Sequence, residues 1–570
     1  MGVRRAVEMA LDLQREAQVQ PIVTYGPLIH NPQTLKLLAS KGICQVNSIE
    51  EIQGGTVIIR AHGISPQEKE LLESKGVSII DATCPRVSQV QAFIRKHAGM
   101  GHFCVIVGDE DHPEVMGLRG FASAGSLVIS GPELSDLINS VPLDRTVCVV
   151  AQTTQEPRTL QAVVGALESV GAKIKVYNTI CDSTRKRQAE VEQLALEADM
   201  VIVVGGKGSG NTQRLAKVAS DRGKPVMHIE TDEEFSSLDL EGLETVGVTA
   251  GASTPNWQIR QVIEKLKHID MASRGDWLSR LRRYGDISVM IYGWAALAGA
   301  GLTVASQTLL SEPLTWMSPA VSALFVFSMH LLNRLQERTG AVRFNTPEIA
   351  SFYIRHEVAL TIIGSISGLM AIALCFSVSF VSGMTLTLMT VTGLLYSLPA
   401  TRLLRFPFTH WRSLKDLPGA KTPLVATGWA MVAVVVPLLD FDYHPGILSL
   451  LVTFSFAFGL VFWRTALSDL LDIQGDRIVG RETIPILLGV ENTRKLLNRI
   501  LLLLGLLLLL SGLTGLTSAV SFCLMLSLAY NYALFRILLK KNLVDRLFLE
   551  AVTDINFIFA GFLSVAYMLW

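Results

Sequence analysis

Polar side chains stand within seven residues of the ends of three apolar runs of strand length in the first half of the chain. His62 follows TVIIR, Glu114 follows FCVIV, and Thr153 follows VCVV. Ligands of open α/β sheets bind in the crevice beyond the carboxyl ends of the strands, so these side chains are predicted to converge. An imidazole, a carboxyl and a hydroxyl group can bind a polar ligand and exchange protons with it. Taken singly, each is more often a hydrogen-bonded structural residue.

The run GGKGSGNT at 205–212 suits a bound anion. Its glycines let backbone N–H groups approach a ligand, and the amphipathic helix predicted after it favours negative charge at its N-terminus. The spacing is not that of a nucleotide-binding P-loop. A tight turn capped by Asn211 explains the same residues, so both interpretations stay open.

The seven cysteines fall into different surroundings. Cys84 in DATCP and Cys181 in TICDS lie in polar, turn-like segments, whereas Cys104 and Cys148 lie inside apolar strands and are predicted core thiols. Spacing alone does not link Cys84 to Cys181, so each is either an inert thiol or a metal ligand. No C-x-x-C pair and no secretory signal peptide occur, which argues against a disulfide framework and predicts a cytosolic location for this half.

Alternating apolar runs and amphipathic helical stretches predict the elements that hold these residues. Strand-like runs at 56–60, 103–107, 147–150 and 200–204 are separated by helical patterns, which is typical of βαβ units around parallel sheets. The sequence therefore predicts an α/β fold for the first half.

Composition indicates that the second half lies in lipid. The chain has 570 residues, 49% of them hydrophobic, and a mean hydropathy of +0.39, which is too apolar for two soluble domains. Its 50 basic and 50 acidic residues give no net field that would attract nucleic acid. We expect a soluble domain at 1–267, a polar linker at 268–286 and a transmembrane domain at 287–570.

Nine short strings of the soluble half, taken together, resemble one family, the 4-hydroxy-3-methylbut-2-enyl diphosphate reductases. Members of this family make isopentenyl and dimethylallyl diphosphate. Order and spacing agree over essentially the whole soluble half, so the resemblance is very specific. The strings are MGVRRAV (1–7), IHN (29–31), RAHGIS (60–65), DATCP (81–85), DHPEVMG (111–117), AQTT (151–154), ICDST (180–184), GSGNT (208–212) and TAGAST (249–254).

The resemblance implies three pseudo-equivalent α/β modules around a 4Fe-4S cluster held by three cysteines, two of which match Cys84 and Cys181. It implies a reductive dehydration that uses two electrons and two protons, with ferredoxin or flavodoxin as an electron donor. Glu114 matches the acid that protonates the departing hydroxyl, and Thr153 matches its hydroxyl partner. The residues that match positions around the substrate and its diphosphate are His30, His62, His112, Thr153, Ser209, Asn211 and Ser253.

One position departs from the family pattern. In the family a cluster cysteine directly precedes the string that begins here at Met1. We therefore expect an in-frame cysteine codon immediately upstream of Met1, with the true start further upstream.

The second half contains nine uncharged stretches long enough to cross a bilayer as helices. Loops after even-numbered stretches carry basic residues such as Arg338, Arg405 and Lys540, and loops after odd-numbered ones carry only acids such as Glu312 and Asp440, or no charge. The positive-inside rule then places the N-terminus in the cytoplasm and predicts a multi-pass protein of the inner membrane. The stretches are 287–306, 313–332, 358–379, 384–401, 422–439, 446–463, 500–516, 518–535 and 551–570.

An acidic motif, DLLDIQGDRIVGRETIP, follows the sixth stretch. Its carboxylates Asp469, Asp472 and Asp476 stand near helical spacing and can hold Mg²⁺, which neutralises a diphosphate leaving group. A solvated acidic loop is the alternative. Through Gly480 and Thr483 the motif resembles the second aspartate motif of the UbiA-type prenyltransferases, and nine spans also fit that family.

The first aspartate motif of that family is incomplete here. In NRLQERTGA, Asn333 and Glu337 match its opening asparagine and its middle acid, while Arg334 and Ala341 replace two aspartates. The sequence predicts a reductase fused to a UbiA-like, all-α membrane domain that acts on isoprenoid diphosphates and contacts lipid. Two alternatives remain, a membrane half that only anchors or binds lipid, and a chain that is a non-catalytic scaffold. Asp554, inside the last stretch, is either a functional intramembrane acid or a residue that reaches the interface.

Overall fold

The chain forms two compact units, Met1–Ile269 and Asp270–Trp570. The computed structural model describes residues 2–16, 21–130, 140–274, 277–337, 347–395, 417–439, 445–479, 482–538 and 546–570. Each unit is described separately below. Seven residues used in the predictions above lie outside the described ranges: Met1, Arg338, Ala341, Arg405, Asp440, Gly480 and Lys540.

The first unit is built on three parallel sheets, which confirms the predicted α/β class. The first sheet has the strand order β2-β1-β3-β4. Its elements are α1 (Gly2–Glu16), β1 (Ile22–Tyr25), α2 (Pro32–Ser40), β2 (Ile43–Val46), η1 (Ile49–Glu51), β3 (Thr56–Ile59), α3 (Pro66–Ser74) and β4 (Ser78–Asp81).

The second sheet has the order β6-β5-β7-β8, and the third has β10-β9-β11. The second sheet is formed with α4 (Pro85–Ala98), β5 (Phe103–Val107), α5 (Pro113–Arg119), β6 (Ser126–Ile129), β7 (Val147–Ala151), α7 (Pro157–Ser169) and β8 (Ile174–Tyr177). The third is formed with α8 (Asp182–Glu197), β9 (Met200–Val204), α9 (Gly210–Ser220), β10 (Val226–Ile229), η2 (Asp232–Glu234), η3 (Leu238–Leu240), β11 (Val246–Ala250) and α10 (Asn256–Arg274).

The three sheets repeat one strand order. In each, the second strand in sequence lies on one side of the first strand and the third strand lies on the other, and the first two sheets add a fourth strand beside the third. The chain therefore reverses its direction of travel across each sheet between its first and third strands. This reversal is a topological switch point, where ligands of α/β proteins bind. The arrangement of the three sheets around an iron-sulfur cluster stays a prediction.

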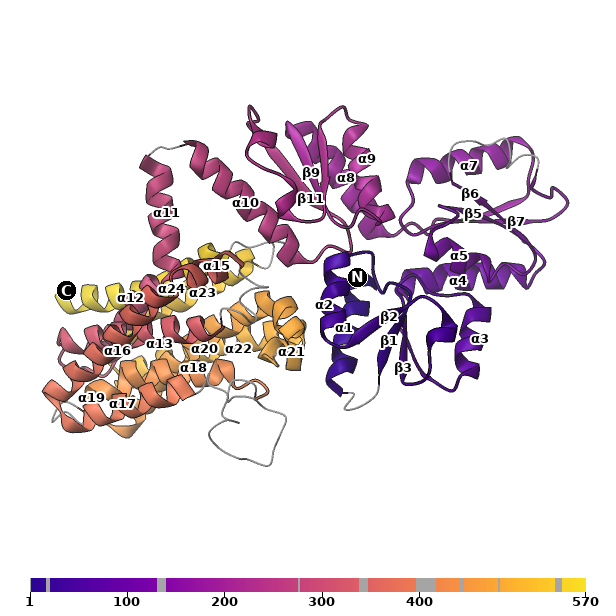
Figure 1. The fold of residues 1–570 in the computed structure, drawn as a ribbon. Helices are drawn as coiled ribbons and strands as arrows, with labels where there is room; N and C mark the ends of the chain where they lie inside the picture. Colours follow the sequence, from indigo (N-terminus) through magenta and orange to yellow (C-terminus); the bar gives the residue numbers. More distant parts are fainter. Residues whose placement is uncertain are drawn as a thin grey trace. The chain divides into compact units, whose positions relative to one another are not determined.

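The second sheet has apolar strands, and several helices of this unit begin with proline. Every residue of β7 is buried, as expected for a parallel strand covered on both faces. In Figure 1, α4 and α5 lie on one face of this sheet and α7 lies on the other. Proline occupies the first turn of α2, α3, α4, α5 and α7, where its missing N–H costs no helical hydrogen bond.

The second unit is helical throughout its described elements. Residues 268–286, predicted as a linker, are helical where the structure describes them, at the end of α10 and the start of α11. The elements are α11 (Trp277–Met290), α12 (Gly293–Leu309), α13 (Met317–Glu337), α15 (Pro347–Arg355), α16 (Glu357–Val378), α17 (Phe380–Leu395), α18 (Lys421–Ala430), the π-helical turn η6 (Met431–Val435), α19 (Val436–Leu438), α20 (Ile447–Val479), α21 (Ile484–Leu488), α22 (Val490–Leu513), α23 (Val520–Leu538) and α24 (Arg546–Leu569).

Six of the described helical segments are long and apolar enough to cross a membrane. A seventh is reached if Tyr284–Met290 and Gly293–Leu309, which meet at an angle of 66°, are one broken span. Helices α13 and α17 also lie on predicted stretches, but α17 is a shorter apolar helix. The multi-pass character is thus supported, while the number nine stays a prediction. The six segments are Glu357–Val378, Lys421–Leu438, Ile447–Ile473, Val490–Leu513, Val520–Leu538 and Arg546–Leu569.

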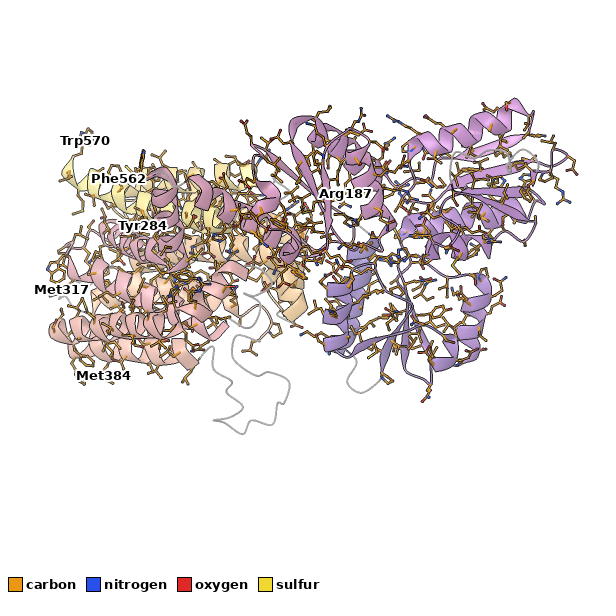
Figure 2. All side chains as sticks on the ribbon, turned by 45° about the horizontal axis from the view of Figure 1, so that its top comes forward. Arg187, Tyr284, Met317, Met384, Phe562 and Trp570 are labelled. Carbon is orange, nitrogen blue, oxygen red and sulfur yellow. The ribbon has the colours of Figure 1, made fainter. Side chains whose placement is uncertain are left out.

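Large apolar side chains cover the outside of this unit, as a lipid-facing surface requires. Met384 and Phe562, labelled in Figure 2, are 50% and 66% exposed. Inside the unit, α12 and α24 approach closely at Gly301 and Gly561. A Cβ built on Gly301 would overlap the carbonyl oxygen of Phe557, so only glycine permits this approach.

We expect Gly301→Ala to destabilise the helical unit by about 1–3 kcal/mol, because the added methyl group forces α12 and α24 apart. The thermal midpoint of the full-length protein in detergent, followed by circular dichroism, should fall. Gly428→Ala is the matched control, since a Cβ at Gly428 in α18 meets no atom within 4 Å. Equal midpoints for the two variants would contradict the close approach.

Candidate active site

Helices α2, α5 and α9 each begin just after the first strand of a sheet. Asn31 caps α2, His112 caps α5, and Ser209 is the N-cap residue of α9. All three helices start at the carboxyl edge of their sheet, beside the switch point. Three positive helix N-termini are thereby available to a negatively charged ligand.

The third strand of each sheet leads into a second loop of the same edge. His62 follows β3, Thr153 follows β7, and Ser253 follows β11. The predicted substrate residues therefore occupy equivalent positions in the three sheets, in two loops per sheet. Neither the family strings nor the spacing alone indicates this equivalence.

Hydrogen bonds bring loops of different sheets together. Asn31 Nδ2 donates to Gln258 Oε1 over 2.8 Å, and Ser253 Oγ donates to the carbonyl oxygen of His30 over 3.2 Å. Both bonds join the first sheet to the third. Gly206 packs directly against the backbone of His30, where a Cβ would lie 2.6 Å from the carbonyl oxygen.

Three imidazoles meet where the first and second sheets join. The ring centroids of His30 and His62 are 4.7 Å apart, those of His62 and His112 are 5.4 Å apart, and those of His30 and His112 are 5.7 Å apart. Burial lowers the pKa of His30 and, to about 4, that of His112, and it lowers the pKa of His62 well below its usual value. The positive charge of Arg60 contributes in each case. All three rings are therefore neutral near pH 7.

Distance alone would permit a metal ion among these rings, because their ligand atoms lie within 4.8 Å of one another. The hydrogen bonding of His112 argues otherwise. Its Nδ1 accepts the backbone N–H of Glu114 at 3.1 Å, so the proton of the neutral ring sits on Nε2. A protonated nitrogen donates a hydrogen bond and offers no lone pair to a metal, so this ring suits a ligand that carries acceptors.

Further donors within the described residues have no partner. Among them, in the loops of this site, are His30 Nε2, His62 Nδ1 and the side-chain amide nitrogen of Asn211, which stands in the first turn of α9. Buried donors without partners cost free energy that an anionic ligand recovers. The loop at 205–212 therefore fits the predicted anion site, and Asn211 itself does not cap its helix.

Glu114 and Thr153 form the one carboxyl–hydroxyl pair among the predicted site residues. The backbone N–H of Thr153 donates to Glu114 Oε1 over 2.7 Å, and the hydroxyl of Thr153 lies 2.9 Å from Oε2. Glu114 is only 2% exposed. Burial raises its pKa, although the bonds from Thr153 oppose the shift. A carboxyl group of this kind holds its proton to higher pH than an exposed one and can deliver it to a bound substrate.

Cys84 and Cys181 are the N-cap residues of α4 and α8, and neither side chain caps its helix. Arg86 and Asp182, in the first turns of these helices, form an ion pair of 2.9 Å, so the two helix starts lie close together. Burial raises the pKa of the Cys181 thiol, but hydrogen bonds from Ser183 and the nearby Arg86 outweigh it and lower the pKa. Two free thiols at facing helix N-termini are donors that fit an iron-sulfur cluster.

The three aspartates of the membrane unit are buried on α20. Asp469 accepts hydrogen bonds from Lys421 Nζ at 2.6 Å and from Thr422 at 2.8 Å. Asp472 pairs with Arg546 at 2.8 Å through Oδ2, while its Oδ1 has no partner within the described ranges. The oxygen donors of Asp469, Asp472 and Asp476 suit Mg²⁺, but cations already neutralise the first two.

The sequence analysis did not single out the basic partners Lys421 and Arg546. A signal was available, because both residues lie just before predicted membrane stretches. Asp554 pairs with Arg464 at 2.6 Å, and both are buried, so it does not reach the interface. Arg334 is partly buried in α13, and the side chain of Glu337 lies outside the described part of the structure.

Comparisons with known proteins cover both units. The LytB protein family matches residues 1–267, and the UbiA prenyltransferase family matches residues 294–551. The chain is similar to the 4-hydroxy-3-methylbut-2-enyl diphosphate reductase of Geobacter sulfurreducens, with 42% identity over 276 residues that cover 48% of this chain and 95% of the relative. It is also similar to that of Aquifex aeolicus, with 41% identity over 269 residues that cover 47% and 92%.

Two solved structures are similar to the two parts. A structure of (E)-4-hydroxy-3-methyl-but-2-enyl diphosphate reductase is 39% identical, covers 47% of this chain and 95% of its own, and has a TM-score of 0.38. A UbiA homolog from Archaeoglobus fulgidus bound to GPP and Mg²⁺ is 16% identical, covers 49% and 99%, and has a TM-score of 0.36. The chain belongs to the LytB family of 4-hydroxy-3-methylbut-2-enyl diphosphate reductases through its α/β unit, which is fused to a domain of the UbiA prenyltransferase family.

Proposed function

We propose that the α/β unit reduces 4-hydroxy-3-methylbut-2-enyl diphosphate to isopentenyl and dimethylallyl diphosphate. The observation that carries this proposal is the buried Glu114–Thr153 pair, which lies beside three neutral imidazoles. A protonated acid with a hydroxyl partner serves the loss of a hydroxyl group, and neutral donors serve a diphosphate.

The reaction consumes two electrons and two protons. Glu114 donates one proton to the departing hydroxyl group, so the C–O bond breaks and water leaves. The second proton forms a C–H bond on the five-carbon chain, and its position decides which of the two products appears. Thr153 orients the carboxyl group of Glu114 through its hydroxyl and its backbone N–H.

Cys84 and Cys181 would supply two of the three thiolates that hold the 4Fe-4S cluster implied by the family. When bound, this cluster supplies the electrons and an iron that accepts the substrate hydroxyl. A small electron-transfer protein, such as ferredoxin or flavodoxin, delivers these electrons. The exposed ion pair of Arg86 with Asp182 shows that the two helix starts lie close together.

The diphosphate is held by neutral donors and helix N-termini. His30, His62 and His112 each offer one N–H, and burial keeps the rings uncharged until the anion enters. Ser209 and Asn211 offer hydrogen bonds at the start of α9, and Ser253 adds a hydroxyl from the loop after β11.

We further propose that the membrane unit binds a prenyl diphosphate as UbiA-type prenyltransferases do. Asp469, Asp472 and Asp476 would hold Mg²⁺, which neutralises the diphosphate, and Lys421 and Arg546 add positive charge beside them. In this proposal nine spans cross the inner membrane, the unit at 287–570 contacts lipid, and residues 1–267 lie in the cytoplasm.

One observation favours a second function for the membrane unit. The cations Lys421 and Arg546 already pair with two of its aspartates, and the first aspartate motif has Arg334 and Ala341 in place of acids. An acidic motif in which two of three carboxylates already pair with the protein's own cations suits a membrane anchor or a lipid-binding module without transferase activity.

Glu114→Gln keeps the shape of the side chain but removes its proton. We expect the variant to retain its cluster and its affinity for substrate, while kcat falls about 10²–10⁴-fold. Anaerobic turnover of the full-length protein measures this. The matched control is Glu110→Gln, because Glu110 lies in the same loop with a 62% exposed side chain. Turnover within a few fold of wild type in Glu114→Gln would remove Glu114 from the role of acid.

The same substitution predicts a stability difference that depends on pH. The folded state holds the Glu114 proton to higher pH than the unfolded chain, whose carboxyl titrates near 4.5. Stability is therefore lost as pH rises from 4.5 through the raised pKa, after which the loss is constant. The thermal midpoint of full-length Glu114→Gln minus that of wild type should therefore increase as pH rises over this interval. A difference that does not vary with pH contradicts the raised pKa.

For the membrane unit we expect weak, Mg²⁺-dependent binding of a prenyl diphosphate by the full-length protein. Asp472→Ala should abolish it, because a central carboxylate is lost, and Arg334→Ala should weaken it by removing a positive charge. Glu491→Ala is the control, since Glu491 is a 70% exposed acid at the start of α22. Titration with geranyl diphosphate and an excess of chelator separates the outcomes, and no Mg²⁺-dependent binding supports the anchor instead.

A further inference from the structure

Arg214 is a largely buried cation beside the site whose role no observation above explains. It lies in α9, one helical turn after Asn211, and its side chain is 11% exposed. Its guanidinium forms hydrogen bonds with Asp109 and Thr154, which belong to loops of the second sheet. A buried arginine of this kind loses hydration, so its partners must compensate.

The guanidinium makes two short contacts. One terminal nitrogen bonds to Asp109 Oδ2 at 2.5 Å, and the other donates to Thr154 Oγ1 at 2.9 Å. Asp109 lies in the loop that leads to Glu114, and Thr154 directly follows Thr153. Arg214 therefore holds both loops that carry the carboxyl–hydroxyl pair.

A third hydrogen bond joins the two loops to each other within the second sheet. The backbone N–H of Asp109 donates to Gln152 Oε1 at 3.0 Å, so the two loops are tied to each other as well as to Arg214. The helix that carries Arg214 begins with Ser209 and Asn211, which face the proposed diphosphate. One side chain thus spans from the anion-binding helix to the proton donor.

We propose that Arg214 is a positioning residue that couples diphosphate binding at α9 to the alignment of Glu114 and Thr153. This proposal rests on the reductase function proposed above. A guanidinium suits the task because its planar fork fixes two partners at once, whereas a lysine ammonium can reach only one of them in that geometry.

The charged groups near Glu114 predict how substitutions of Arg214 and Asp109 change the pKa of Glu114. The groups that face Glu114 are Arg214 from α9, Asp109 from the loop after β5, neutral His112 from its own helix start and the Thr153 hydroxyl. Burial raises the pKa of Glu114 most; Arg214 lowers it, and Asp109 raises it. Loss of Arg214 therefore raises the Glu114 pKa further, and loss of Asp109 lowers it.

The experiment compares Arg214→Gln, Arg214→Lys, Asp109→Asn and the double variant Arg214→Gln/Asp109→Asn in the full-length protein. Arg119→Gln is the matched control, because Arg119 forms an exposed ion pair with Glu110 at the end of α5. Infrared spectroscopy follows the carbonyl band of the protonated Glu114 carboxyl, which is identified as the band missing in Glu114→Gln. Anaerobic turnover gives kcat, KM and their pH profiles.

We expect the infrared midpoint and the alkaline limb of kcat to shift to higher pH in Arg214→Gln and to lower pH in Asp109→Asn. In the double variant, the infrared midpoint of Glu114 should return toward the wild-type value, while kcat should stay low. Misalignment should lower kcat roughly 10²-fold in Arg214→Gln and less in Arg214→Lys, with a smaller rise in KM. Arg119→Gln should match wild type throughout.

Two outcomes overturn the proposal. One is an infrared midpoint in Arg214→Gln equal to that of Arg119→Gln. The other is a shift of the same sign in Arg214→Gln and Asp109→Asn, which indicates a general structural disturbance. A separate outcome concerns the reductase proposal alone. If wild type and Arg119→Gln show no turnover, the reductase proposal fails. If the infrared midpoints of Arg214→Gln and Asp109→Asn nevertheless shift in opposite directions, the placement of Arg214 beside Glu114 is supported.

Discussion

All strand pairs described in the α/β unit are parallel, and this constraint decides where every site residue lies. A crossover from one parallel strand to the next must leave at the carboxyl edge and return at the other edge. Each sheet therefore presents all of its strand-to-helix loops at its carboxyl edge. Repetition of one strand order in three sheets supplies matched loops from each of them, which no single sheet could provide.

Neutrality is the second property of the site. Burial lowers the pKa values of the three imidazoles, so that none carries charge near neutral pH, and it raises the pKa of the Glu114 carboxyl beside them. A site of neutral donors binds an anion without first breaking strong internal ion pairs. The membrane unit has the opposite design, because its acids Asp469, Asp472 and Asp554 are each paired with a cation.

The sequence was sufficient for the α/β class and for central strands of the three sheets, while the roles of the predicted site residues stay predictions. Strand runs such as FCVIV were readable because both faces of a parallel strand are buried. The neighbourhood of Cys84 and Cys181 was not, since it arises when α4 and α8 begin side by side, and no local pattern encodes that. The pairing of Lys421 with Asp469 was missed for the same reason.

Hydropathy was less informative about the number of spans. Helix α13 carries His330 and Arg334 within its apolar sequence, and α12 is bent from the segment before it at Tyr292, whose φ of 62° is left-handed. A hydropathy count treats a bent, a short and a polar helix alike, so it cannot separate a full span from a partial one.

The third sheet ends after three strands within the described residues, and the chain passes from β11 directly into α10. An added domain can therefore follow this last helix without interrupting a sheet. A fusion at this point leaves the strand order of all three sheets unchanged, so the loops that carry the candidate site keep their places at the carboxyl edges of the strands.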